Sequence, residues 1–196
     1  DNRKAVIMFS DTLWIALALS LPLGYLLGAI PFGDLAGRSR GVDMRTTGSG
    51  NPGAANIFRK VDRRLGLAVG AADIAKGAAA VLLGRWLGLP TEMAVLPGAT
   101  AVLGHWHSPF LGFRGGAGLA VAVGVGVGMV PLPGAFGAAT ALAFILLRRN
   151  VGVGAGFGYA AAVIAGLALR EPRWLLVEAT LLGILVLVRS QVLQRR

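Results

Sequence analysis

The chain has 196 residues, of which 55% are hydrophobic and only 14% are charged. A soluble domain of this length could not bury so much apolar surface, so the composition predicts one integral membrane domain over residues 1–196. The net charge of +10 comes from basic residues beside apolar segments, which favours anionic lipid headgroups and excludes nucleic acid as a partner. The absence of cysteine excludes disulfides and thiolate metal sites.

Hydropathy predicts an all-α integral membrane protein built as a seven-transmembrane-helix bundle. The predicted spans are 12–31, 65–83, 92–110, 117–131, 134–147, 151–169 and 172–190. The first span is too long for the core of a signal peptide, so we expect it to be retained. The fourth and fifth spans are short and flank the turn Pro131-Leu132-Pro133, which favours a helical hairpin, with six spans as the alternative if one of them does not cross. Glycine-rich runs at 124–128 and 152–156 indicate close helix–helix contact.

The basic residues predict the orientation of this bundle. With the N-terminus outside and the C-terminus in the cytoplasm, Lys76 lies within the second span and most of the 19 Lys and Arg residues fall inside, as the positive-inside rule requires. The residues placed inside are Arg38, Arg40, Arg45, Arg59, Lys60, Arg63, Arg64, Arg114, Arg148, Arg149, Arg189, Arg195 and Arg196. The same orientation brings every polar motif to the cytoplasmic side.

A polar, glycine-rich segment runs from Thr47 to Arg59 between the first two spans. Backbone amides, Ser and Asn side chains and a nearby Arg are groups that bind phosphate oxygens. Part of this segment, Gly48 to Gly53, matches the dinucleotide pattern G-x-G-x-x-G. That pattern needs a preceding strand, whereas Phe32 to Arg45 is predicted to be a polar, basic loop, so a Rossmann site is rejected.

The same segment predicts a local structure. Pro52 is expected to begin a short helix with Asn51 or Ser49 as its cap. Such a helix would direct its N-terminal amides at an anion, and a capped turn without a ligand is the alternative. Gly50 and Gly53 allow close approach of the backbone to a ligand.

Two ionisable residues lie within the second span, in Asp73-Ile-Ala-Lys76-Gly77. At a spacing of three residues Asp73 and Lys76 share a helix face and can form an ion pair. Ionisable groups inside a membrane usually face the interior of a bundle or a cavity. The functional interpretation is that Lys76 holds a phosphate and Asp73 orients it, and the alternative is a neutralised structural pair.

A second candidate for anion binding lies in residues 104–118, where Arg114, Gly115 and Gly116 are expected to open a helix. His105 and His107 are the only histidines, and without a nearby carboxylate they do not predict a metal site. The sequence contains no Ser-His-Asp, paired-carboxylate or H-E-x-x-H arrangement, so covalent catalysis and hydrolysis by two carboxylates have no support.

Three segments together resemble the bacterial acyl-phosphate:glycerol-3-phosphate acyltransferase family. Ser49-Gly-Asn-Pro-Gly-Ala-Ala-Asn56 is similar to its first motif, S-G-N-x-G-x-T-N, and Asp73-Ile-Ala-Lys76-Gly77 is similar to its D-x-x-K-G element. Gly104-His105 with Phe110-Leu-Gly-Phe-Arg-Gly-Gly-Ala-Gly118 resembles its second motif, G-H…F-L-x-F-K-G-G-K-G. The resemblance implies a seven-helix enzyme of the bacterial inner membrane with its N-terminus outside.

The resemblance also implies an activity and a site. The enzyme would transfer a fatty acyl group from acyl phosphate to the 1-hydroxyl of glycerol 3-phosphate, the first step of phospholipid synthesis, without a cofactor or metal. A substrate phosphate would itself take the hydroxyl proton. The expected catalytic residues are Ser49, Asn51 and His105, and the expected phosphate-binding residues are Gly50, Gly53, Asn56, Arg59, Asp73, Lys76, Arg114, Gly115 and Gly116.

The chain departs from the family pattern at several positions. Ala117 stands where the second motif has Lys, Ala55 replaces Thr in the first motif, and Val188 and Gln191 replace the His and Asn of a C-terminal H-x-x-N-I element. These departures leave an alternative open, a catalytically degenerate paralogue that serves as an accessory or lipid-binding subunit of a larger membrane assembly. A transporter of a phosphorylated metabolite is a third reading, for which no inverted repeat is visible.

Overall fold

All regular secondary structure in the described residues is helical, as predicted. The structure is a computed structural model that describes residues 2–148 and 150–194. Its helices are α1 (Asn2–Ala29), α2 (Phe32–Arg38), α3 (Ala54–Lys60), α4 (Arg63–Trp86), α5 (Val95–Trp106), α6 (Leu119–Met129), α7 (Pro131–Arg148), α8 (Val151–Ala168) and α9 (Arg173–Gln194), with 3-10 turns at Thr91–Met93 and Pro109–Leu111. Three basic residues used to predict the orientation, Arg149, Arg195 and Arg196, lie outside the described residues.

Each of the seven predicted spans overlaps one of the longer helices. Within the described residues, four stretches are long and apolar enough to cross a bilayer, namely Asp11–Arg38, Arg63–Trp86, Pro131–Arg148 and Arg173–Val192. Two of the others are short, because α5 has 12 residues and α6 has 11. The chain is therefore an all-helical membrane protein, while the crossing of the bilayer by all seven helices stays a prediction.

The helix boundaries differ from the predicted ones near two prolines, Pro109 and Pro131. Span 92–110 is too long, because α5 ends at Trp106 and Pro109 disfavours helical backbone at Ser108. Pro131 lies in the first turn of α7 instead of in a turn before it, a position where a proline needs no backbone N–H. Only Val130 separates α6 from α7.

The prediction of a polar loop over residues 32–45 is wrong for its first half, which forms α2. Arg38 Nε lies 2.7 Å from the Asp34 carboxylate one turn earlier, a spacing that supports a helix. The buried face of α2 carries Gly33, where a side chain would overlap the carbonyl of Pro52. The polar run of residues 47–53 therefore packs directly on α2.

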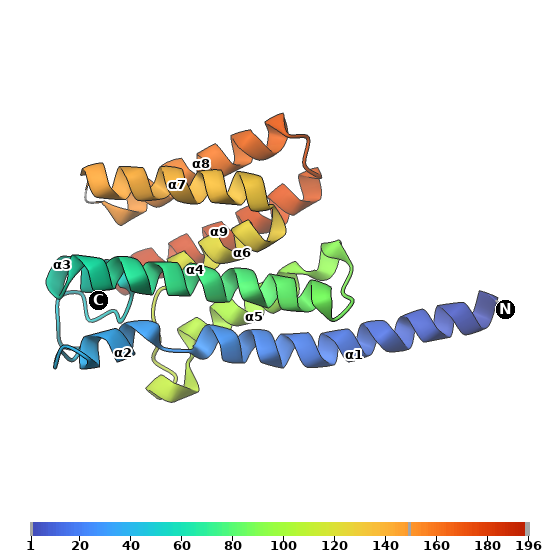
Figure 1. Cartoon of the computed structure of the whole chain (residues 1–196), viewed down its shortest axis with the longest axis horizontal. Coiled ribbons are helices and arrows are strands. Elements are labelled where there is room, and N and C mark those ends of the chain that lie inside the picture. The colour runs from blue at the N-terminus through green and yellow to red at the C-terminus, as the bar shows by residue number, and fades with distance from the viewer. Residues whose placement is uncertain (1, 149, 195–196) are drawn as a thin grey trace.

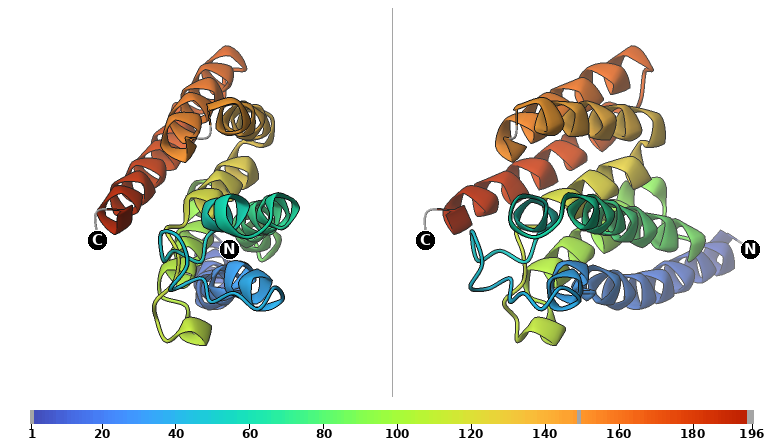
Figure 2. Two further views of the ribbon diagram at one scale, coloured as in Figure 1. Left: turned by 90° about the vertical axis from the view of Figure 1, so that its left-hand side faces the viewer. Right: turned by 60° about the vertical axis from the view of Figure 1, so that its left-hand side comes forward.

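The helices lie in layers (Figures 1 and 2). The hairpin of α7 and α8 forms one outer layer, α1 with α2 forms the opposite one, and α4, α5, α6 and α9 lie between them. The most extensive helix pairs are α7 with α8, α4 with α6 and α1 with α5. The short helices α2 and α3, the start of α4 and the end of α9 lie at the same end of the bundle.

Glycines allow these three pairs to approach closely. In each pair, a side chain on the glycine would overlap backbone of the facing helix, as at Gly28 and Gly104 between α1 and α5, Gly77 and Gly124 between α4 and α6, and Gly137 and Gly158 between α7 and α8. Because lipid tails are as apolar as the helices, such close packing is the main source of association inside a bilayer. The predicted contact through glycine-rich runs is confirmed at Gly124, Gly128 and Gly154, whereas Gly126 and Gly156 face open space.

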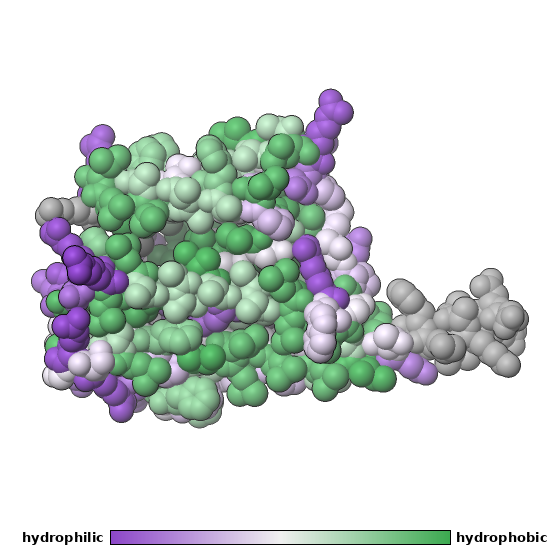
Figure 3. All heavy atoms as spheres, in the orientation of Figure 1, coloured by the Kyte–Doolittle hydropathy of each residue, from purple (hydrophilic) through white to green (hydrophobic). Residues whose placement is uncertain are grey.

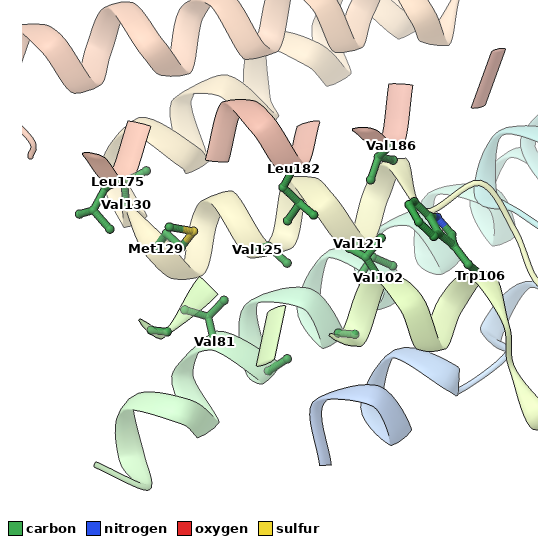
Figure 4. Packing of buried hydrophobic residues seen from close by; sticks show 13 residues of the cluster. Val81, Val102, Trp106, Val121, Val125, Met129, Val130, Leu175, Leu182 and Val186 are labelled. Atoms are coloured by element: carbon green, nitrogen blue, oxygen red, sulfur yellow. The ribbon is translucent and has the colours of Figure 1, made fainter. Parts of the chain in front are cut away.

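The apolar side chains form both an interior and a lipid-facing surface. The largest buried cluster joins α4, α5, α6 and α9 through residues such as Val81, Val102, Val125 and Val186 (Figure 4). Many large apolar side chains nevertheless remain exposed, and the space-filling view shows them as a broad band between polar ends (Figure 3). Such a band suits a bilayer.

This packing predicts opposite effects for two glycines of the same helix. Gly124→Ala places a methyl group against the backbone of Ile74, so we expect it to reduce the free energy of unfolding by about 1–3 kcal/mol. Gly126→Ala meets nothing within 4 Å and is expected to be neutral or slightly stabilising. Thermal unfolding in detergent, followed by tryptophan fluorescence, distinguishes the two. Equal melting temperatures would contradict this account of the α4–α6 contact.

Candidate functional site

Three polar side chains meet in the interior beside the end of α1. Lys76 Nζ lies 2.8 Å from Asp73 Oδ1, 2.9 Å from His105 Nδ1 and 2.9 Å from the carbonyl oxygen of Ile30. The Asp73 and Lys76 side chains are each only 3% exposed, and His105 is 10% exposed. The contact between Asp73 and Lys76 confirms the predicted ion pair, although Asp73 Oδ1 has no partner of hydrogen-bond geometry.

These contacts define what Lys76 can do. An ammonium group has three donors, and Lys76 has three acceptors within 2.9 Å, namely Asp73, His105 and Ile30. Two of these contacts are hydrogen bonds, to His105 and Ile30, and the third is the ion pair with Asp73. Lys76 does not line the large cavity that opens beside these groups. The geometry therefore does not support the expectation that Lys76 holds a phosphate directly. Lys76 and Asp73 instead lie against Nδ1 of His105, at 2.9 and 4.0 Å.

The same contacts select one form of His105. Because the ammonium of Lys76 donates to Nδ1, that nitrogen must present its lone pair. In the neutral imidazole the proton then lies on Nε2. His105 lines the cavity, and its Nε2 lies beside the backbone of Gly116.

Asn56 organises the first polar loop. Its Nδ2 donates to the carbonyls of Thr47 and Asn51 at 2.8 and 3.0 Å, and its Oδ1 accepts from the amide of Ser49 at 3.2 Å. Asn56 is buried at 2% exposure, so these bonds use its polar atoms to hold the loop. The loop is also tightened by Gly50, whose amide donates to Thr47 and whose φ is +69°.

The predicted helix in this loop forms, but with a different cap. α3 begins at Ala54 with Gly53 at its N-cap and no side-chain cap. The expectation that Asn51 or Ser49 caps it is therefore wrong, because the helix begins two residues later than predicted. Asn51 is left with a buried Oδ1 that has no hydrogen-bond partner. Buried acceptors are usually hydrogen-bonded, and Asn51 lines the cavity, where a donor on a ligand would satisfy this one.

The second polar loop lies against the first at Gly116. A Cβ atom on Gly116 would lie 2.6 Å from His105 Nε2 and 3.1 Å from Asn51 Oδ1, so both polar atoms face the same stretch of backbone. The amides of Gly115 and Gly116 donate to the carbonyls of Trp106 and His105 at 2.9 and 3.1 Å. These amides are not free for an anion, and the helix opens only at Leu119.

Further contacts fix the second loop in place. Arg45 Nη2 donates to the Leu111 carbonyl at 2.7 Å and so connects the two polar loops. Ser108 Oγ donates to the Ala29 carbonyl, and the Tyr25 hydroxyl donates to the His107 carbonyl, both at 2.6 Å. The end of α1 thus carries the second loop on one side and accepts Lys76 on the other.

A cavity of about 870 Å³ opens beside these groups. Its polar end is lined by Asn51, Gly53, Asp73, His105 and three cations, Arg59, Lys60 and Arg63. The rest of its lining is mostly apolar and comes from α3, α4, α6 and α7, the loop before α6, and Ala155 of α8. The polar end and the apolar part therefore form one continuous cavity.

Asp62 caps α4 directly before Arg63, one of the three cations that line the cavity. Asp62 caps the helix, accepting the Leu65 amide at 2.8 Å, and this bond is the largest cause that lowers the pKa of its carboxyl group. The carboxylate is therefore retained at mildly acidic pH, where the cap keeps supporting α4. The stabilisation is present above the ordinary pKa and is lost as the pH falls through the lowered one.

The predicted site residues divide into those that face the cavity and those that support it. Asn51, Gly53, Arg59, Asp73 and His105 line the cavity, and Gly50, Asn56, Lys76, Gly115 and Gly116 shape its surroundings. Ser49 and Arg114 are exposed and do not line it.

Sequence reasoning missed Lys60 and Arg63 as lining residues and Arg45 as the connection between the loops. The run of basic residues from Arg59 to Arg64 is a signal for the first two. The role of Arg45 depends on a backbone carbonyl 66 residues away, and nothing in the sequence pattern indicates it.

The altered second motif packs against the end of α9. Ala117 lines the cavity, and its carbonyl accepts a hydrogen bond from Trp106 Nε1 at 2.8 Å. The Arg189 guanidinium lies 4.6 Å from the centre of the Trp106 ring, a cation–π distance. Arg189 thus brings a further positive charge near His105 from a helix that the sequence-based site did not include.

Fold and site together define an all-helical membrane protein with a polar pocket that opens into an apolar cavity. The family model for glycerol-3-phosphate acyltransferase matches residues 18–195. The chain therefore belongs to the glycerol-3-phosphate acyltransferase family.

Curated relatives agree with this assignment. Glycerol-3-phosphate acyltransferase 1 of Deinococcus radiodurans is 54% identical over 102 residues, which is 52% of each chain. The glycerol-3-phosphate acyltransferase of Geobacter metallireducens is 47% identical over 102 residues, 52% of this chain and 53% of the relative. The chain thus spans about half the length of the curated relatives it matches.

Solved structures match over more of the chain. Crystal structures of PlsY (YgiH), an integral membrane glycerol 3-phosphate acyltransferase, are similar in its glycerol 3-phosphate form, with a TM-score of 0.78, and in its lysophosphatidic acid form, with a TM-score of 0.76. Both are 31% identical to this chain and cover 90% of it and 88% of the PlsY chain.

The buried ion pair predicts that removing one charge destabilises the protein more than removing both. Lys76→Met removes the cation and leaves the Asp73 carboxylate buried without its counter-ion, so we expect a loss of about 3–5 kcal/mol in the free energy of unfolding. The double variant Asp73→Asn, Lys76→Met removes both charges and should recover a large part of that loss. Thermal unfolding of the single and double variants in detergent measures this coupling. Additive losses would contradict the pairing.

Proposed function

We propose that this protein transfers a fatty acyl group from acyl phosphate to the 1-hydroxyl of glycerol 3-phosphate. The observation that carries the proposal is the cavity itself, which joins three cations and His105 to an apolar space. Acyl phosphate needs both parts, because its phosphate is anionic and its chain is a hydrocarbon. Family membership and the likeness to PlsY support acyl transfer to glycerol 3-phosphate.

The residues at the polar end are assigned roles by their chemistry. Arg59, Lys60 and Arg63 neutralise substrate phosphates. His105 donates from Nε2 to a phosphate or to the oxyanion that forms at the acyl carbon. The unpartnered Oδ1 of Asn51 accepts from a hydroxyl of glycerol 3-phosphate and so orients the nucleophile.

The reaction balances without a protein base. The 1-hydroxyl oxygen forms an ester bond with the acyl carbon, and the bond between that carbon and the phosphate oxygen breaks. The hydroxyl proton passes to the departing phosphate, so the products are lysophosphatidic acid and inorganic phosphate. His105 does not take this proton in the proposal, because the nitrogen that could accept one, Nδ1, faces Lys76.

The proposal includes a membrane orientation. The polar loops, the three cavity cations and the end of α9 lie at one end of the bundle (Figure 1), where the positive-inside rule puts the cytoplasm. All seven longer helices would cross the bacterial inner membrane, with the N-terminus outside and the C-terminus in the cytoplasm. The accessory-subunit alternative is not favoured, since the cavity retains cations despite Ala117.

The two histidines provide a matched test of the proposal. Purified protein is expected to release inorganic phosphate and form lysophosphatidic acid from palmitoyl phosphate and glycerol 3-phosphate. His105→Ala removes the cavity donor and should lower kcat by about 100- to 1,000-fold. His107→Ala changes an exposed side chain outside the cavity and should keep kcat within about twofold. Folded protein without any phosphate release would refute the activity and return the accessory role to consideration.

Adjacent arginines test the cationic end. Arg63 lines the cavity, whereas its neighbour Arg64 does not, and both are exposed. Arg63→Gln is therefore expected to raise the KM for glycerol 3-phosphate about threefold to tenfold, and Arg64→Gln should leave it nearly unchanged. Steady-state kinetics at fixed ionic strength measure both values. An equal increase in the two variants would indicate a general effect of charge at this surface instead of binding in the cavity.

A further inference from the structure

A second, smaller cavity of about 100 Å³ continues the first between α6, α7, α8 and α9. Five residues line both cavities, namely Leu119, Val123, Ala138, Ala141 and Ala155. The two spaces are therefore neighbours with a common wall of mainly small side chains. Nothing in the sequence motifs pointed to this region.

The order of the lining residues gives the second cavity a direction. Along α6, Ala120 lines the first cavity, Val123 lines both, and Gly126 lines only the second. Along the following helix, Leu142 lines the first, whereas Gly134 lines the second. The second cavity thus lies farther from the polar loops, deeper along the bundle axis.

The length of this path suits an acyl chain. Leu119 and Val130 line the near and far parts of the two cavities, and eleven residues of helical rise separate them by about 16 Å. The hydrocarbon chains of one leaflet span about 15 Å, half of the bilayer core. A chain of membrane-lipid length that starts in the polar pocket therefore reaches the second cavity.

The lining of the second cavity is chemically suited to hydrocarbon. Among its described lining residues the one polar side chain is Tyr159, and its hydroxyl donates to the hydroxyl of Thr180. With that group satisfied, the cavity offers no free polar atom of a side chain to hold water. Glycines and alanines form much of the remaining wall, so a slender chain fits where a bulky group does not.

We propose that this second cavity receives the distal end of the acyl chain of the acyl phosphate and sets the chain length that the protein prefers. The inference rests on the proposed acyl-transfer function and deepens it. A methylene group gains little on leaving lipid for an apolar cavity, because both surroundings are apolar. Selection among acyl chains therefore comes from shape. A long chain needs the space of the second cavity, and a cavity filled by a side chain excludes it.

Gly126 is suited to a test because of its surroundings. A Cβ atom at this position meets no atom within 4 Å, and Gly126 lines the second cavity. Gly126→Leu should therefore fill the cavity without displacing a helix. Gly156 is a matched control, since it lies on α8, also meets nothing within 4 Å, is exposed and lines neither cavity.

The experiment compares octanoyl, lauroyl and palmitoyl phosphate as donors for each purified protein. Gly126→Leu is expected to lower kcat/KM for palmitoyl phosphate about tenfold while leaving octanoyl phosphate within about twofold. Gly156→Leu should keep the chain-length profile of the unsubstituted protein. Gly183→Val fills the same cavity from α9, where a Cβ makes only ordinary contact with Tyr159 at 3.6 Å, and should change the profile in the same direction.

The outcomes distinguish a failure of the chain-length inference from a failure of the proposed acyl transfer. An unchanged ratio of palmitoyl to octanoyl activity in folded Gly126→Leu and Gly183→Val would overturn the inference while leaving acyl transfer intact. An equal loss at all chain lengths would overturn it as well, because a filled distal cavity should not affect a short chain. Absence of transfer by the unsubstituted protein with every donor would instead refute the proposed function, and the inference with it.

Discussion

The site depends on one ammonium group and the three acceptors around it. A charge buried in a membrane protein is usually paired and hydrogen-bonded, and Lys76 has an ion pair with Asp73 and hydrogen bonds to His105 and the carbonyl of Ile30. Those acceptors come from α4, α5 and the end of α1. The same group therefore joins three parts of the chain and holds Nδ1 of His105.

Glycine contacts beside these residues make the geometry attainable. Gly77 follows Lys76 and packs on the backbone of Val121 in α6, and Gly104 precedes His105 and packs on the backbone of Tyr25 in α1. A larger side chain at either glycine would push the helices apart, and the short distances around the ammonium could not be kept. The glycine in D-x-x-K-G and in G-H is thus a packing requirement of the neighbouring polar residue.

Much of this arrangement is readable from the sequence, for identifiable reasons. Hydropathy locates the long helices because each has a nearly continuous apolar composition, and helical spacing predicts the Asp73–Lys76 pair. Contacts that end on backbone carbonyls are not readable, because any residue supplies one. Two hydrogen bonds are of this kind, one from Lys76 to the carbonyl of Ile30 and one from Arg45 to the carbonyl of Leu111. So is the cap of α3, where Gly53 replaces the expected side chain.

The positions that depart from the family motifs lie close to other positive charges in the structure. Ala117 removes a cation from the cavity wall, yet Arg59, Lys60 and Arg63 remain at the same end. Near the end of α9, Val188 and Gln191 are exposed, whereas Arg189 turns toward Trp106 beside His105. Because phosphate is stabilised by the sum of nearby positive charges, the proposed function depends on charge at this end of the cavity and not on lysine at one position.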